Sequence, residues 1–370
     1  MIRILHIVTH MNRGGLETML MNYYRHIDRK KIQFDFLVHR EQQADYDQEI
    51  LDLGGKIYRA PRLNPYSIKY HLFLKAFFEE HDFPIVHSHL NCMSGIPLSA
   101  AKKSGKSVLI AHSHSQSQEK NLKYPIKMVQ KRKVPRNSDY RFACSEAAGD
   151  WLFSGEKFMI FRNAIDTDRF NFNVENAQEK KRELGIKDEL VIGHVGRFNV
   201  VKNHSYIIDI FEKITEKCDA RLLLIGEGNK KTEIIEKVNR LSLDKKVMFL
   251  GKREDIPELL QTMDVFLFPS LFEGLAVSLI EAQATGLPCI VSDTISEEVN
   301  VTGLIKQVSL EADIDQWVDA ILLAQKNVRR SFKKELKNSG YDISEAVKKL
   351  ENFYWSVLEG NALSNEEVQI

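Results

Sequence analysis

Cysteine is scarce in this sequence, and its scarcity excludes a disulfide framework. The chain has 4 cysteines in 370 residues, Cys92, Cys144, Cys218 and Cys289. They form no Cys-x-x-Cys pair and no spacing to histidine that is typical of zinc sites. Each lies in or beside an apolar run, which predicts buried, reduced thiols in a cytoplasmic protein.

Long hydrophobic runs and an excess of charge of one sign are also missing. No stretch approaches the roughly 20 uncharged apolar residues that span a bilayer. The apolar run at residues 1–9 is too short for a signal sequence and predicts a first β-strand. Lys and Arg (52) nearly balance Asp and Glu (51), so no global field directs the protein to nucleic acid. We therefore expect a cytoplasmic protein that, at a membrane, would lie on its inner face.

Short apolar runs alternate with longer segments of helical period along almost the whole chain. This alternation is typical of βαβ units, whose parallel sheets carry helices on both faces. A chain of 370 residues suits two such domains, so we expect the α/β class with a doubly wound sheet in each half. The predicted strands are residues 2–8, 34–38, 56–59, 85–87, 107–111, 140–143, 158–161, 190–195, 221–225, 247–250, 265–268, 289–291 and 304–305.

A polar and charged stretch, residues 166–188, separates the two series of strands. We place the connection between the domains there, which gives an N-terminal domain of residues 1–165 and a C-terminal domain of residues 166–342. Apolar residues at helical spacing predict a helix over 343–358 that can pack back on the first domain. Residues 361–370 have the character of a loose tail.

The segment 264–293 carries two glutamates on a predicted strand–loop–helix turn. The helix is expected over about 275–285, ended by Gly286. Ligands of doubly wound sheets bind outside the carboxyl ends of the strands, where this loop lies. Glu273 and Glu281 offer oxygens to sugar or ribose hydroxyls beside a helix N-terminus. The residues alone equally allow a capping Glu273 and a solvated Glu281.

A second predicted strand–loop–helix turn, residues 191–211, carries two cations. Arg197 follows the strand and Lys202 precedes the helix. A forked guanidinium and a compact ammonium suit a diphosphate. Alone, this motif would indicate solvated loop charges; together with the paired glutamates it indicates a binding site.

These motifs resemble those of the retaining glycosyltransferases of family 4 (group 1), and of bacterial capsule and exopolysaccharide transferases in particular. The patterns that carry the resemblance are E-G-x6-E at residues 273–281, followed by A-x-A-x-G-x-P, and G-R-x4-K at residues 196–202. Weaker matches extend it from residue 9 to residue 288. The resemblance implies the GT-B fold, in which two Rossmann-like domains face each other across a cleft.

The resemblance also assigns roles to the site residues. It implies that Glu273 contacts the donor sugar, that Glu281 contacts the ribose, and that Arg197 and Lys202 bind the donor diphosphate. Other donor-binding residues implied on the same basis are Gly14 and Gly15 in the first loop, Gly196, the turn residues Gly226 and Gly228, and Gly274 and Leu275.

Two histidines, His112 and His114, follow the predicted strand 107–111. The family commonly carries a histidine here that positions the donor sugar near the transferring carbon. Spacing does not separate the two, and we favour His112 because it is nearer the predicted strand end. A metal site is disfavoured because no third ligand is evident in the sequence.

The resemblance implies a hexosyl- or related glycosyltransferase that retains anomeric configuration, with no cofactor and no metal. The expected donor is a nucleotide-diphosphate sugar, UDP rather than GDP, and the acceptor a glycan that can be polyprenyl-diphosphate-linked. A nucleotide-sugar epimerase and a non-catalytic nucleotide-sugar-binding partner of another transferase are the alternatives.

The basic segment 119–141 has apolar residues between its cations. Such a segment can lie on an anionic membrane surface. The equal alternative is a solvated helix that packs its apolar side on the first domain.

Overall fold

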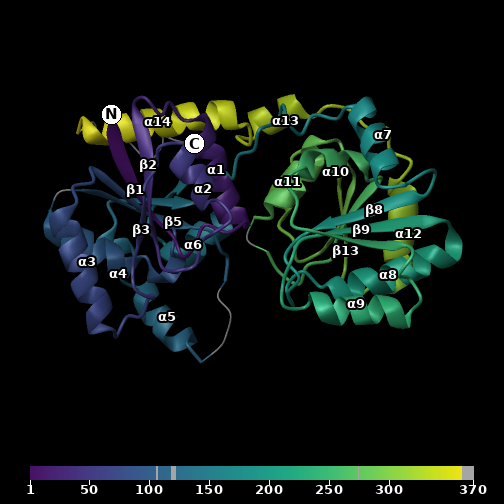
Figure 1. Cartoon of the computed structure of the whole chain (residues 1–370), viewed down its shortest axis with the longest axis horizontal. Helices are drawn as coiled ribbons and strands as arrows, with labels where there is room; N and C mark the ends of the chain where they lie inside the picture. The colour runs from purple at the N-terminus through teal and green to yellow at the C-terminus, as the bar shows by residue number, and fades with distance from the viewer. Residues whose placement is uncertain (106, 118–121, 274, 361–370) are drawn as a thin grey trace. The chain divides into compact units, whose positions relative to one another are not determined.

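The computed structural model describes residues 1–105, 107–117, 122–273 and 275–360. The chain divides into two compact units, Asp166–Tyr341 and, around it in sequence, Met1–Ile165 with the segment that starts at Asp342. Each unit contains one parallel sheet with helices packed on it (Figure 1). The predicted α/β class with a doubly wound sheet in each half is therefore confirmed.

The first unit is built on a seven-stranded sheet in the order β3-β2-β1-β4-β5-β6-β7. The order reverses direction between β1 and β4, which pair in parallel with His6 opposite His87. In such sheets, ligands bind at the carboxyl ends of the strands that flank the reversal. The strands are β1 (Ile2–Ile7), β2 (Ile32–Val38), β3 (Ile57–Arg59), β4 (Ile85–Ser88), β5 (Val108–Ser113), β6 (Tyr140–Ala143) and β7 (Met159–Ile160).

The second unit contains a six-stranded sheet in the order β10-β9-β8-β11-β12-β13, with the reversal between β8 and β11. Buried aliphatic and aromatic side chains fill these strands, as expected where helices cover both faces. The strands are β8 (Leu190–Val195), β9 (Ala220–Ile225), β10 (Val247–Gly251), β11 (Val265–Phe268), β12 (Cys289–Ser292) and β13 (Ile305–Val308). Every predicted strand is found, with ends that differ by a few residues.

Helices connect most successive strands in both units, and further helices precede or follow the strands. In the first unit they are α1 (Gly15–His26), α2 (Asp47–Asp52), α3 (Ile68–Glu80), α4 (Gly95–Ser104), α5 (Tyr124–Lys131), α6 (Glu146–Phe153) and α14 (Ile343–Leu358), with short 3-10 turns at Asn91–Met93 and Pro135–Asn137. In the second unit they are α7 (Val174–Glu183), α8 (His204–Lys217), α9 (Lys231–Arg240), α10 (Ile256–Thr262), α11 (Val277–Ala284), α12 (Ile314–Ala324) and α13 (Lys333–Asn338), with a 3-10 turn at Glu297–Val299.

Helix α7 lies within the stretch predicted to connect the two domains. It packs on α10 and so belongs to the second unit. The 4 cysteines are free; Cys218 is half-buried and the others are buried. Of the helices that the structure describes, none has both the length and the apolar character to cross a bilayer.

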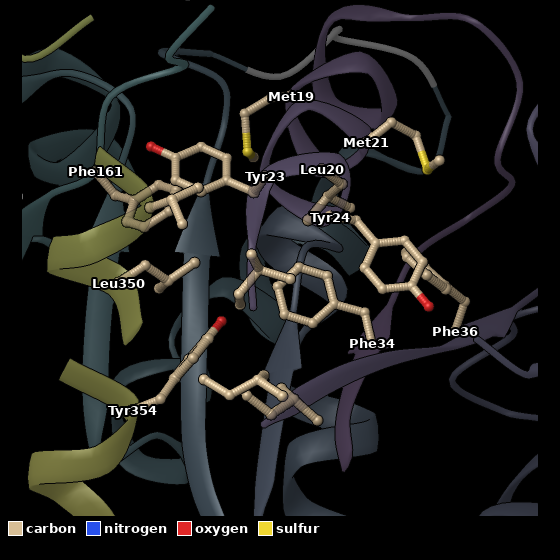
Figure 2. Close-up of a cluster of buried hydrophobic side chains, with 14 of the residues drawn as sticks. Met19, Leu20, Met21, Tyr23, Tyr24, Phe34, Phe36, Phe161, Leu350 and Tyr354 are labelled. Atoms are coloured by element: carbon tan, nitrogen blue, oxygen red, sulfur yellow. The ribbon is translucent and has the colours of Figure 1, made fainter. Parts of the chain in front are cut away.

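Helix α14 completes the core of the first unit, as its apolar spacing predicts. Its N-terminus is capped by Asp342, whose carboxylate accepts a hydrogen bond from the Ser344 amide. Leu350 and Tyr354 of this helix point into the same buried cluster as Phe34 (Figure 2). Tyr354 Oη also lies 3.2 Å from Nδ1 of His87 on β4. Residues far apart in sequence thus share one core.

We expect Phe353→Ala to destabilise the first unit strongly. Phe353 is fully buried, and its ring lies 4.9 Å from that of Phe142 on β6, so truncation leaves a cavity that costs about 3–5 kcal/mol. Chemical denaturation should show this loss in the unfolding free energy. Lys348→Ala on the exposed face of the same helix should change it little. Equal effects of the two substitutions would show that α14 does not stabilise this core.

Candidate active site

The two sequence motifs of the second unit meet at the reversal of its sheet. Residues 196–203 follow β8 and residues 269–273 follow β11, the two strands that flank the reversal. The loops are hydrogen-bonded to each other: the Leu271 amide donates to the Val201 carbonyl at 2.8 Å, and the Asn203 side-chain amide donates to the Pro269 carbonyl at 3.2 Å. The sheet therefore brings both motifs to one place, as the sequence predicts.

Lys202 and Glu273 form an ion pair across these loops. The Lys202 ammonium lies 2.7 Å from a Glu273 carboxylate oxygen, and the side chains are only 15% and 17% exposed. The ammonium also lies 4.3 Å from the ring centroid of Phe268 at the end of β11. Low exposure strengthens both interactions because water screens them less. One predicted cation and one predicted carboxylate are thus fixed against each other.

Arg197 extends from the same loop into solvent. It is exposed, and its guanidinium forms no ion pair with any residue that the structure describes. The loop itself is held in shape: Asn199 accepts a hydrogen bond from the Lys202 amide at 3.1 Å, and Asn203 takes a left-handed conformation with φ 54° at the start of α8. A rigid loop with one exposed guanidinium and one fixed ammonium suits an anionic ligand.

Two glycines of the motifs are required by backbone packing. A Cβ on Gly226, at φ +139°, would lie 2.1 Å from the Gly196 carbonyl oxygen, and one on Gly228 would lie 2.2 Å from that of Phe198. These two positions need glycine because the loops after β8 and β9 touch. A Cβ on Gly196 would instead meet a side chain, at 2.7 Å from Nε2 of His194. The contact of these three glycines with a nucleotide stays a prediction.

Glu281 lies in the second turn of α11 and is half-buried. Burial raises the pKa of its carboxyl group to about 7, although the positive charge of Arg169 opposes the shift. The helix begins at Val277, two residues later than predicted, so Leu275 is a buried residue of the preceding loop. Gly274 lies outside the described residues.

The first loop of the chain leads from β1 to the N-terminus of α1. Gly14 is the N-cap residue, with an extended backbone at φ −156°, and its carbonyl accepts from the Thr18 amide at 2.8 Å. Gly15 is exposed. Both lie beyond the carboxyl end of β1 beside the reversal of the first sheet. The contact of Gly14 and Gly15 with the donor stays a prediction.

His112 lies within a strand, and the expectation that the strand ends at residue 111 is wrong. β5 continues to Ser113 because His112 and Ser113 pair with Phe142 and Ala143 of β6. His112 is fully buried, whereas His114 follows the strand and is half-buried. The reason for favouring His112, its nearness to the strand end, therefore now applies to His114.

Three further histidines join this pair in the first unit: His6 on β1, His87 at β4 and His89 just after it. Nδ1 of His6 lies 3.0 Å from Nε2 of His89, and Nδ1 of His89 lies 3.0 Å from Nε2 of His114. Sequence reasoning missed this cluster. The available signal was the repeat of His-Ser-His at residues 87–89 and 112–114 on two adjacent strands.

The five imidazoles are held neutral. Burial lowers the pKa of His6 and His114 to about 3, and burial together with neighbouring imidazoles lowers the pKa of His87, His89 and His112 well below the ordinary value. Several buried ring nitrogens have no hydrogen-bond partner among the described residues, each at a cost of about 1–3 kcal/mol. They are Nε2 of His6 and His87, both nitrogens of His112, and Nδ1 of His114.

We expect Glu281→Gln to change how stability depends on pH. The folded-state pKa of about 7 exceeds the ordinary 4.5, so the stability this group contributes is present below about pH 4.5 and is lost as the pH rises through 7. The amide stays neutral, so the gain in unfolding free energy of the variant relative to the parent should grow as the pH rises from 4.5 and reach about 3 kcal/mol above pH 7. Denaturation across this range measures the difference.

Glu236→Gln, at an exposed position, is the control and should run parallel to the parent. The same parallel behaviour in the Glu281 variant would mean that Glu281 ionises normally in the folded protein.

Each unit of the chain matches a family model. The family model for glycosyl transferases group 1 matches residues 189–327, and that for Glycosyltransferase Family 4 matches residues 13–169. A Bacillus subtilis (strain 168) protein named as a glycosyltransferase, EpsF, is 40% identical over 369 residues, covering 95% of this chain and 96% of that protein. The UDP-Gal:alpha-D-GlcNAc-diphosphoundecaprenol alpha-1,3-galactosyltransferase of Escherichia coli is 26% identical over 303 residues, covering 76% and 77%.

Among solved structures, that of HepE from Anabaena in complex with UDP and glucose superimposes with a TM-score of 0.79 at 15% identity, over 96% of this chain and 100% of that one. At this identity the likeness shows the fold, which is GT-B. The match to EpsF over nearly the whole length shows the family. The chain therefore belongs to the glycosyltransferases of group 1 and family 4.

Proposed function

We propose that this glycosyltransferase moves a sugar from a UDP-sugar to a lipid-linked glycan with retention of anomeric configuration. The observation that carries the donor half of the proposal is the ion pair between Lys202 and Glu273 at the reversal of the second sheet, with Arg197 on the same loop. UDP as the nucleotide is supported by the complex of HepE with UDP and glucose. The acceptor class is supported by the relative from E. coli, whose name specifies a diphosphoundecaprenol acceptor.

The donor step requires stabilisation of a leaving diphosphate. When the bond from the anomeric carbon to the phosphate oxygen breaks, both electrons of that bond stay on the oxygen. Lys202, fixed by Glu273 and Phe268, and Arg197 would hold this charge without a divalent metal. Glu273 would orient the sugar, and Glu281 the ribose. The acceptor hydroxyl attacks on the same face, and its proton passes to the leaving phosphate.

A basic hollow in the first unit fits the proposed acceptor. It encloses about 1150 Å³ and is lined by the cations Arg40, Arg59, Arg62, Lys69, Lys123 and Lys127, with Glu41 as the one carboxylate among the described lining residues. Apolar side chains, Leu63, Tyr66, Phe73 and Ile126 among them, complete the lining. Cations next to apolar surface suit a diphosphate that is attached to a lipid.

Helix α5 borders this hollow and carries part of the basic segment predicted for a membrane surface, of which residues 119–121 lie outside the described residues. It packs on the 3-10 turn Asn91–Met93 and on α4, so part of its apolar side is covered by the first unit. Leu122, just before the helix, is fully exposed, and Val129 is 54% exposed. Cations among exposed apolar residues support contact with an anionic membrane surface. We include this contact, on the cytoplasmic face, in the proposal.

Removing either cation of the donor site should abolish most turnover. We expect Lys202→Ala and Arg197→Ala to lower kcat by about 100- to 1000-fold because charge on the leaving diphosphate loses its partner. The assay uses the nucleotide sugar that most raises the melting temperature in a screen of UDP- and GDP-sugars. Lys230→Ala, which removes a half-exposed cation paired with Glu233, is the control and should keep the parental rate.

Circular dichroism should show that the Lys202 and Arg197 variants are folded. If these folded variants matched the Lys230 variant in rate, the two residues would not bind the leaving group. If the protein consumed the donor without an acceptor and released an epimerised nucleotide sugar, its activity would be epimerisation and not transfer.

Membrane contact should depend on the exposed apolar residues Leu122 and Val129. We expect the protein to float with liposomes that contain anionic lipid at low salt, and not with neutral liposomes. The double variant Leu122→Asp, Val129→Asp should not float, because each change replaces an exposed apolar side chain with a negative charge that anionic lipid repels. Leu323→Asp, which alters a residue 69% exposed in the second unit, should float as the parent does. Flotation unaffected by the paired change would place the contact elsewhere.

A further inference from the structure

A trio of histidines at the carboxyl edge of the first sheet has the composition of a metal centre. The members are His89, His112 and His114, and one ring nitrogen from each lies within 4.8 Å of those of the other two. We infer that this trio binds a divalent transition-metal ion of the zinc class. The inference concerns the first unit alone and does not depend on the donor residues of the second.

Two of the three nitrogens are spaced nearly as ligands on one ion. Zinc–nitrogen bonds of about 2.0–2.1 Å in a tetrahedral site put neighbouring nitrogens roughly 3.3 Å apart. Nδ1 of His89 and Nε2 of His114 are 3.0 Å apart, so for this pair a shift of a few tenths of an ångström suffices, and a nitrogen of His112 lies within 4.8 Å of the other two ligand atoms. His112 is fully buried, and neither of its nitrogens has a hydrogen-bond partner among the described residues, so whichever nitrogen carries the lone pair is available to an ion.

His6 supplies the outer contact that a ligating histidine requires. Ligating imidazoles donate their second ring N–H to an acceptor, which fixes the tautomer. Nε2 of His89 lies 3.0 Å from Nδ1 of His6. If Nε2 of His89 donates to His6, then Nδ1 of His89 presents its lone pair to the ion. The same assignment leaves His6 protonated on Nε2.

The ligand set of the trio decides which ions fit it. Three imidazoles and no carboxylate favour Zn²⁺, Co²⁺, Ni²⁺ or Cu²⁺ over Mg²⁺ and Ca²⁺. His114 is half-buried, which leaves one side of the centre toward the surface for a fourth ligand, water or an anionic oxygen.

The sequence disfavours a metal at His112 and His114 for want of a third ligand, and strand register removes that objection. Ser88 of β4 lies opposite Ala111 of β5, so the next residue along, His89, continues beside His112. The third ligand is thus 23 residues away from His112 in the chain but adjacent across the sheet, an arrangement that linear spacing does not show.

Binding of Co²⁺ to the full-length chain, with any purification tag removed, tests the inference directly. Co²⁺ in a site of nitrogen ligands absorbs visible light, and Zn²⁺ should displace it with loss of that absorption. We expect one ion per chain. His114→Gln, at the half-buried position, and His112→Gln should each weaken binding by at least about 10- to 100-fold, the loss typical of even an outer-shell partner.

Two controls separate this trio from other histidines. His71→Gln removes an exposed histidine outside the cluster and should leave the affinity unchanged. His87→Gln alters the inner neighbour that contacts Tyr354 and should change affinity much less than His114→Gln does. Metal-free melting curves of every variant establish that each is folded; if His112→Gln is not, His114→Gln carries the test.

The inference is overturned if the parent protein takes up neither Co²⁺ nor Zn²⁺ at micromolar concentrations. It is also overturned if His114→Gln, folded, binds as the parent does, or if His71→Gln loses binding equally. Lys202→Ala, which alters the donor site of the second unit, should take up Co²⁺ as the parent does, so a failure here is distinct from a failure of the proposed donor site.

Discussion

The contact between the loops after β8 and β11 is the constraint on which the candidate site depends. Two hydrogen bonds join these loops, and the ion pair of Lys202 with Glu273 lies where they meet. The strands that carry the loops are neighbours only because the strand order of the second sheet reverses between them. A cation and a carboxylate 71 positions apart in sequence are therefore fixed within one hydrogen-bond length, with little water around them.

The glycines make this closeness possible. Gly226 and Gly228 let the loop after β9 lie directly against residues 196–198, where any side chain would meet a backbone oxygen at little over 2 Å. The backbone bond from the Phe198 amide to the Glu227 carbonyl then holds Arg197 on a fixed turn. A pattern that the sequence assigns to nucleotide binding is thus a packing requirement in the structure.

Hydrophobic periodicity predicted most of the fold, and loop motifs predicted the ion-paired residues of the candidate site but not the histidine cluster. Strand positions and α14 followed from apolar spacing because each element buries one face or both. Lys202 and Glu273 were found because they lie on loops at strand ends. His6, His87 and His89 were not found, because only sheet register brings them beside His112.

The end of β5 was misplaced because His112 and Ser113, although polar, pair with β6 as strand residues. Glu281 was assigned by motif, but the shift of its pKa arises from burial, which linear sequence does not give.

Helix α14 follows the whole second unit in sequence, yet its side chains fill the core of the unit formed by the first 165 residues. During synthesis on the ribosome, the first unit therefore has to wait for the entire second unit to emerge before Phe34, Phe142 and their neighbours are covered. Until then, an apolar surface near β1, β2 and β6 is exposed in the nascent chain, where it is a natural target for chaperones. A chain cut after residue 341 would keep a complete second unit while its first unit would lack one wall of its core.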